Sequence, residues 1–132
     1  MDSIIFEKSK KFAIRIVGLY SFLCNKKREY VMSKQMLRCG TSIGANLAEA
    51  KYAISENDFL AKLYISLKET SETIYWLDIL HEASVVDDET YLSINEDATE
   101  IRKMLSSSTK TISNRKKGIN AVPKPQQKDP NE

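Results

Sequence analysis

The stretch SKQMLRCGTSIGANLAEA, residues 33–50, decides the fold of this chain. Its apolar residues recur at steps of three, four and seven, which is the period of one face of an α-helix. Gly40, Gly44 and Ala48 follow one another at i, i+4 and i+8, so their small side chains predict the close approach of another helix. We therefore expect a helix over residues 33–53, capped by Ser33. Its expected apolar side comprises Met36, Leu37, Ile43, Leu47, Ala50 and Ile54.

Within this stretch, GTSIG (40–44) matches the nucleophile motif of serine hydrolases, and Asp78 and His81 follow in the order of a catalytic triad. In those enzymes the serine occupies a sharp turn between a strand and a helix, where free backbone N–H groups stabilise an oxyanion. Here the preceding residues predict a continuous helix, in which each backbone N–H group is already bonded to the carbonyl group four residues earlier. The motif therefore does not indicate a hydrolase, and we expect no catalytic residues.

Metal and cofactor sites are not indicated either. Cys24 and Cys39 lack the C-x-x-C spacing and the histidine partners of a zinc site. A di-iron bundle would need paired E-x-x-H motifs, which the chain lacks. We expect both cysteines to be buried thiols, because free cysteine usually packs as a small apolar residue.

The segment over residues 3–25 predicts an amphipathic helix with two apolar stripes. The stripes together cover about 160°, whereas a helix buried on one side needs only about 100°. This excess predicts a second partner surface. The first stripe is Ile5, Phe12, Ile16, Leu19 and Leu23, and the second is Phe6, Ala13, Val17, Tyr20 and Cys24.

Two further helices are predicted, over residues 56–83 and 88–112. Ser55 is a suitable N-cap for the first of them, and Asp87 or Asp88 for the second. Residues 114–132 lose the helical period and contain all three prolines, which predicts a disordered basic tail. Residues 1–113 are therefore expected to form one all-α domain, an antiparallel up-down-up-down four-helix bundle.

Residues 12–24, after Lys10 and Lys11, superficially resemble the apolar part of a signal peptide. Arg15 interrupts the segment, and no small-residue cleavage site follows it. It is also shorter than the roughly 20 apolar residues needed to span a bilayer. We expect a cytoplasmic protein with no membrane partner.

The segments QMLRCGTSIGANLAEA (35–50) and DFLAKLYISLKETSETIYWL (58–77) together resemble the bacterial four helix bundle protein family, also called intervening-sequence proteins. The resemblance extends to about residue 112. It implies an up-down-up-down bundle that assembles into a ring-shaped homopentamer with no known enzymatic activity. A more distant branch contains the accessory variability protein of diversity-generating retroelements, a basic pentamer that binds nucleic acid and the reverse transcriptase.

Charged and amide residues of the second and third helices predict a polar network between them. A short connection makes these helices antiparallel neighbours, and charges between packed helices are tolerated when they are paired. We expect Arg38 to meet Glu69 or Glu72, with Asn46 or Glu49 completing the network. The alternative is a solvated face.

The distribution of charge indicates partners more clearly than the net charge of +2. Residues 1–38 carry nine basic and three acidic groups, and residues 39–105 carry five basic and thirteen acidic groups. Residues 106–132 carry six basic and two acidic groups. A basic patch on the first helix and the following turn could contact the phosphates of RNA or DNA without reading sequence. Alternatively, the chain is a protein-interaction scaffold whose basic groups pair with acidic helices of a neighbour. The expected patch is Lys8, Lys11, Arg15, Lys26, Lys27 and Arg28.

Overall fold

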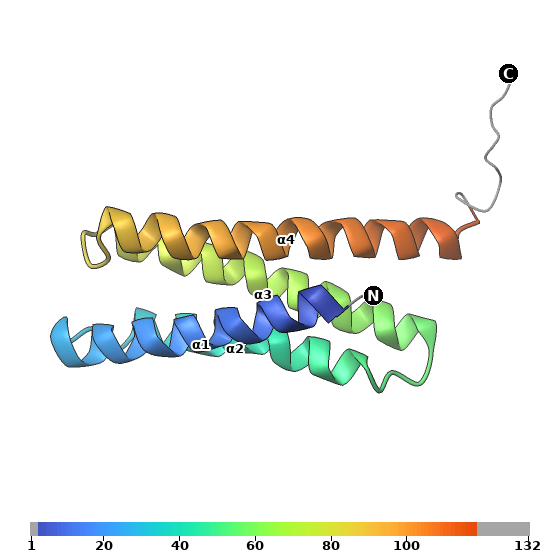
Figure 1. The fold of residues 1–132 in the computed structure, drawn as a ribbon, viewed down its shortest axis with the longest axis horizontal. Coiled ribbons are helices and arrows are strands. Elements are labelled where there is room, and N and C mark those ends of the chain that lie inside the picture. The colour runs from blue at the N-terminus through green and yellow to red at the C-terminus, as the bar shows by residue number, and fades with distance from the viewer. Residues whose placement is uncertain (1–2, 119–132) are drawn as a thin grey trace, which may run out of the picture.

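The computed structural model describes residues 3–118, which form four α-helices joined by short turns (Figure 1). The helices are α1 (Ser3–Lys26), α2 (Met32–Ala50), α3 (Glu56–Glu82) and α4 (Asp88–Lys116). The predicted all-α, up-down-up-down four-helix bundle is confirmed. α4 extends beyond its expected end at residue 112, so residues 114–116 of the expected tail are helical. The predicted disorder of residues 119–132 lies outside the described residues.

Each helix packs against two others, so the four interfaces run in the order α1–α2, α2–α3, α3–α4 and α4–α1. In Figure 1, α1 lies beside α2, and α3 runs obliquely from the end of α2 to the start of α4. The α2–α3 interface is the most extensive and the α1–α4 interface is the smallest. No helix among the described residues is long and apolar enough to cross a membrane.

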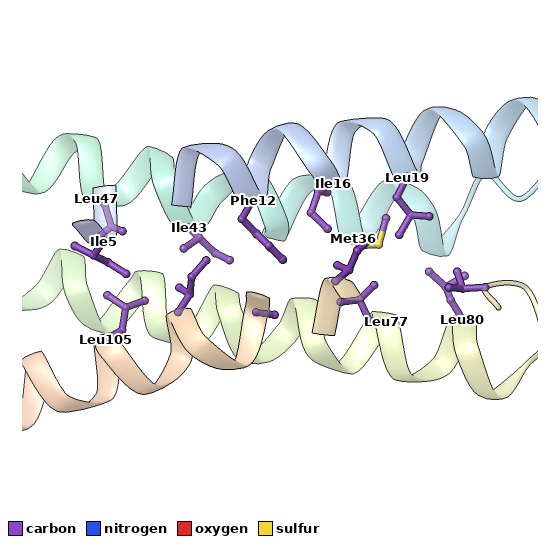
Figure 2. Close-up of a cluster of buried hydrophobic side chains, with 14 of the residues drawn as sticks. Ile5, Phe12, Ile16, Leu19, Met36, Ile43, Leu47, Leu77, Leu80 and Leu105 are labelled. Carbon is purple, nitrogen blue, oxygen red and sulfur yellow. The ribbon is translucent and has the colours of Figure 1, made fainter. Parts of the chain in front are cut away.

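The core is a row of aliphatic side chains along the bundle axis, with Phe12 at its middle (Figure 2). The first stripe of α1 is buried throughout, as its helical period predicts. The second stripe is not: Val17 is 49% exposed, and the other members are partly buried. Ile54 is 93% exposed, which corrects its expected burial, because α2 ends at Ala50 and leaves Ile54 in the following turn.

Glycines let α1 and α2 approach closely. A Cβ atom at Gly40 would lie 3.0 Å from two carbons of Ile16, and one at Gly44 would lie 3.3 Å from the hydroxyl of Ser9. Ala48, expected to share this role, is exposed instead. The close contact between the helices is therefore made at the two glycines.

Hydroxyl groups join α2 to α3. The Ser66 hydroxyl donates to the carbonyl of Ile43 at 3.0 Å. The Thr73 hydroxyl donates to the carbonyl of Glu69 in its own helix at 2.7 Å and lies 3.2 Å from the sulfur of Cys39 on α2. Cys39 is fully buried, and burial raises the pKa of its thiol. Because a buried hydroxyl needs a partner, the bond from Ser66 favours one register between the two helices.

Two helix starts follow their sequence signals. The Ser55 hydroxyl accepts a hydrogen bond from the N–H of Asp58 at 3.0 Å, and the Asp87 carboxylate accepts one from Thr90 at 2.8 Å. Such caps satisfy N–H groups that have no partner inside the helix. Asp87 is therefore the cap of α4, and Asp88 is its first residue.

The start of α2 differs from the expectation, because Ser33 lies inside the helix and is not its cap. The Glu29 carboxylate accepts hydrogen bonds from the N–H groups of Val31, Met32 and Ser33 at 3.1, 3.0 and 2.7 Å. The Ser33 hydroxyl donates to the carbonyl of Glu29 at 2.7 Å. Arg28 adopts a left-handed conformation, with φ of 58°, immediately before Glu29. The turn and the helix start thus form one hydrogen-bonded unit.

Glu29→Gln is expected to lower the free energy of unfolding by about 1 kcal/mol at pH 7, since it removes a charged cap. Partial burial alone would raise the pKa of Glu29, but the three N–H groups together lower it below its usual value. A lowered pKa stabilises the fold above the unfolded pKa of about 4.3, and this contribution is lost as the pH falls through the folded pKa.

The measurement is urea unfolding of the unmodified protein and the Glu29→Gln variant between pH 7 and pH 3. The difference between their free energies of unfolding should shrink toward zero as the pH falls. Glu7→Gln, at an exposed position on α1, is the matched control and should change little at any pH. A difference between Glu29→Gln and the unmodified protein that stays constant with pH would contradict this role of Glu29.

Candidate nucleic-acid interface

Two of the six expected basic residues are bound to α4. Lys8 Nζ lies 3.1 Å from Glu100 Oε1, and Arg15 Nη1 lies 2.6 Å from Asp97 Oδ2. Arg15 Nη2 also donates to the hydroxyl of Ser93 at 2.8 Å. These cations are partly neutralised within the chain, so the structure does not present the expected patch as one group.

The remaining cations gather at the turn between α1 and α2, whereas Lys11 stands apart on α1. Lys26, Lys27 and Arg28 are exposed there, and so is Lys34 in the first turn of α2. Within residues 3–118, no carboxylate lies at ion-pair distance from any of these four cations. We call Lys26, Lys27, Arg28 and Lys34 the basic turn. Lys34 was missing from the expected patch, although its place at the same helix boundary was a usable signal.

Neighbouring acidic groups only partly offset the basic turn. Glu29 lies within the turn, but its carboxylate points at the N–H groups of α2. Asp87 lies in the turn between α3 and α4. The pKa of Asp87 is lowered mainly by the hydrogen bond from the Thr90 N–H, and the nearby charge of Lys27 lowers it further. The outer side of the basic turn therefore remains positively charged.

A cavity of ≈ 750 Å³ opens beside the basic turn, between α1 and the start of α4. Leu19, Val86 and Ile94 supply apolar lining, and each is almost completely buried. Arg15 and Lys27 line the α1 side, and Asp87 and Asp88 line the other side. Because basic and acidic groups face this cavity together, it has no single-sign character that would select an anion.

His81 and Tyr91 join α3 to α4 beside this cavity. Their rings stack with centroids 4.1 Å apart, and His81 Nε2 lies 2.7 Å from Asp88 Oδ1. The Tyr91 hydroxyl donates to Asp78 Oδ1, and this bond is the main reason that the pKa of Tyr91 is raised to about 12. Asp78 and His81 thus serve as structural partners of α4.

Ser42, the serine of the GTSIG motif, lies in the middle of α2. Its hydroxyl donates to the carbonyl of Arg38 at 2.7 Å. In the described part of the chain, His81 and Asp78 make their polar contacts with α4 and not with Ser42. The geometry of a hydrolase triad is therefore not assembled around this serine.

Arg38 contacts both candidate carboxylates on α3. Its Nη2 donates to Glu72 Oε2 at 2.7 Å, and its Nη1 lies 3.7 Å from Glu69 Oε1. The indole N–H of Trp76 also donates to Glu72, and Trp76 and Arg38 together lower the pKa of Glu72. The Arg38 side chain is 53% exposed, so we expect this pairing to contribute at most about 1 kcal/mol.

Asn46 and Glu49 do not join Arg38, which corrects the larger expected network. The Asn46 amide donates to the carbonyl of Ser42 within its own helix at 2.9 Å. Glu49 lies one turn further along α2 and pairs with Lys62 at 2.6 Å. The α2–α3 face therefore carries two separate ion-paired groups.

The fold and these surfaces define a small antiparallel four-helix bundle protein with a basic turn at one end. The family model for the 23S rRNA-intervening sequence protein matches residues 1–107. The chain belongs to this family.

A solved structure gives a second comparison. A Bacteroides thetaiotaomicron protein, described as having unknown function and coming from the S23 ribosomal protein family, is 54% identical to this chain. The alignment covers 81% of this chain and 99% of that protein, with a TM-score of 0.80. No curated protein matches the chain.

Proposed function

We propose that this protein is a non-catalytic homo-oligomer that binds the phosphate backbone of nucleic acid through its basic turn. One observation carries the proposal: the four cations of the basic turn are exposed and lack carboxylate partners among the described residues. Ion-paired residues such as Arg15 would have to give up a carboxylate before binding a phosphate. The assembly is proposed to contain five copies, because the sequence resemblance implies a pentamer.

The chemistry of the basic turn favours phosphate over base recognition. Arg28 can offer a two-pronged donor to phosphate oxygens, and the lysines act as point charges. The N–H groups at the start of α2 are already bonded to Glu29, so they are not free to hold an anion. A ring would repeat the basic turn in every copy, which would strengthen contact with a long polyanion. The family name refers to 23S rRNA, so structured RNA is the first ligand to test.

Fluorescence anisotropy with structured RNA and duplex DNA at 50 and 200 mM salt tests this function. We expect binding at 50 mM salt that weakens steeply at 200 mM. The variant Lys26→Ala, Lys27→Ala, Arg28→Ala should bind at least about tenfold more weakly at 50 mM salt. On DNA, the slope of log K against log salt concentration should also become shallower by about 0.9 for each phosphate contact that the variant loses.

A matched control removes the same charge from exposed positions of α4, as Arg102→Ala, Lys103→Ala, Lys110→Ala. This control should retain most of the affinity. Equal losses in both variants would show that net charge, not the basic turn, governs binding. No binding at 50 mM salt would remove nucleic-acid binding from the proposed function.

A protein-interaction scaffold is the second candidate function, and exposed apolar side chains favour it. Ile14 is 63% exposed on α1, Tyr75 56% on α3, and Leu92 64% on α4. Binding through such residues depends much less on salt than binding to phosphates does. If the protein bound neither RNA nor DNA but kept a protein partner at both salt concentrations, the scaffold function would be favoured.

A further inference from the structure

The cavity between α1 and the start of α4 has the size of a ligand site. Its volume of ≈ 750 Å³ lies within the range of about 300 to 1,000 Å³ that is usual for ligand pockets. Its apolar lining belongs to the folded core, because Leu19, Val86 and Ile94 are members of the core cluster. The cavity is therefore formed by the fold itself.

The polar groups around this cavity are separated by sign. Lys27 lies on the α1 side, and it is one of the exposed cations that lack a carboxylate partner within residues 3–118. Asp87 and Asp88 lie on the other side, at the start of α4, and both are exposed. A matching ligand has an anionic group at one end, N–H donors at the other, and an apolar body between them.

Two flat side chains border the same cavity. Phe22 is 47% exposed, so part of its ring is open to a ligand. The guanidinium of Arg15 is held by Asp97 at 2.6 Å and by the Ser93 hydroxyl at 2.8 Å. Because Asp97 already neutralises Arg15, this group offers a flat surface more than a free charge. Aromatic rings and guanidinium planes are the groups on which unpaired nucleobases stack.

We infer that the cavity binds an unpaired nucleotide of an RNA whose backbone lies on the basic turn. The inference rests on the proposed nucleic-acid binding and names the part of the RNA that is recognised. The phosphate contacts Lys27, the base covers the apolar lining, and its N–H groups donate to Asp87 and Asp88. A paired base is excluded, because it is stacked in the helix and its N–H groups are bonded to its partner.

Guanine is the base that fits this arrangement best. Its imino and amino groups present adjacent N–H donors on one edge, which suit a carboxylate acceptor. Uracil has one N–H group and no amino group, so it can satisfy the acidic side only in part. The basic turn alone would not distinguish these bases, because phosphate contacts carry no sequence information.

Three RNA hairpins test this inference by fluorescence anisotropy at 50 mM salt. They are identical except at one bulged position, which carries guanine, uracil or no base, so all three have the same number of phosphates. We expect the guanine hairpin to bind about tenfold more tightly than the abasic one, as is usual for a stacked base. The uracil hairpin should lie between them.

The double variant Asp87→Asn, Asp88→Asn tests the acidic side. Asparagine caps a helix about as well as aspartate, so the start of α4 should be retained, and circular dichroism checks this. Loss of two negative charges favours binding of every polyanion. We nevertheless expect the preference for guanine over uracil to disappear, because the carboxylate acceptors are gone. A pure charge effect would strengthen binding of all three hairpins equally.

Phe22→Ala tests the flat wall of the cavity. The ratio of affinities for the guanine and abasic hairpins should fall about fivefold, since one stacking surface is lost. The matched control is Glu89→Gln, Glu96→Gln, which removes the same charge as the aspartate variant from exposed positions of α4 outside the cavity lining. This control should keep the preference for guanine.

Guanosine monophosphate distinguishes a free nucleotide from one within an RNA strand. It lacks the neighbouring phosphates that contact the rest of the basic turn, so it should compete with the guanine hairpin only at much higher concentration. Competition at concentrations similar to that of the hairpin would identify a free nucleotide as the ligand and overturn the inference.

The remaining outcomes separate this inference from the proposed function. Equal binding of all three hairpins would leave backbone binding intact and overturn nucleotide recognition by the cavity. If the aspartate variant kept the preference for guanine, or Phe22→Ala kept the ratio of the unmodified protein, the base would lie elsewhere and the inference would fail. If no hairpin bound, the proposed nucleic-acid binding would fail together with it.

Discussion

Phe12→Ala is expected to lower the free energy of unfolding by about 3 to 5 kcal/mol, the usual cost of removing a buried phenylalanine. Phe12 is 1% exposed and lies at the middle of the core row, among Ile16, Met36 and Ile43 in Figure 2. The loss combines the transfer of the ring to water with the cavity left behind. Small domains have a total stability of about 5 to 15 kcal/mol, so this change removes a large share of it.

Urea unfolding followed by circular dichroism measures this difference. Phe22→Ala is the matched control, because Phe22 lies on the same helix but is 47% exposed. The control should lose clearly less stability than Phe12→Ala. Equal losses at the two positions would mean that Phe12 is not the centre of the core.

Gly40→Leu is the second substitution with a large expected effect. A Cβ atom at Gly40 would already lie 3.0 Å from Ile16, and a leucine would drive further atoms into the α1–α2 contact. Overpacking of this kind costs about 1 to 3 kcal/mol and sometimes more, which exceeds the roughly 0.8 kcal/mol gained when glycine leaves a helix. We therefore expect a net destabilisation in thermal and urea unfolding.

Gly18 provides the comparison, because nothing lies within 4 Å of a Cβ atom built there. Gly18→Leu should leave stability unchanged or raise it slightly, since only helix propensity changes. Adding Ile16→Ala to Gly40→Leu should cost less than the sum of the two single changes, because they share one space. Additive losses would show that Ile16 is not the residue that excludes a side chain at position 40.

Most of the fold could be predicted because it depends on local patterns. The buried stripe of α1 follows from its helical period, and the caps at Ser55 and Asp87 follow from side-chain chemistry within three residues. The start of α2 could not be predicted in this way. Its cap, Glu29, is positioned by the left-handed conformation of Arg28, which the residue type does not require.

The candidate site was less predictable because it depends on contacts between distant helices. Arg38 and Glu72 lie on helices joined by a short turn, so their proximity follows from the topology. The pairing of Lys8 and Arg15 instead depends on the register between α1 and α4, the first and last helices. A usable signal was present, since Asp97 and Glu100 occur in the reverse order of Arg15 and Lys8, as antiparallel helices require. Without the register between α1 and α4, however, the sequence does not distinguish Lys8 and Arg15 from cations that have no carboxylate partner.

The small size of the α1–α4 interface has a consequence for how the chain folds. The other three interfaces join helices that are consecutive in the sequence, so most of the native contacts close short loops. Chains dominated by local contacts fold within about microseconds to milliseconds. The pairing of α1 with α4 must close the longest loop, yet it adds the least packing. We therefore expect the three successive hairpins to set the folding rate of this bundle, and the meeting of its first and last helices to contribute little to it.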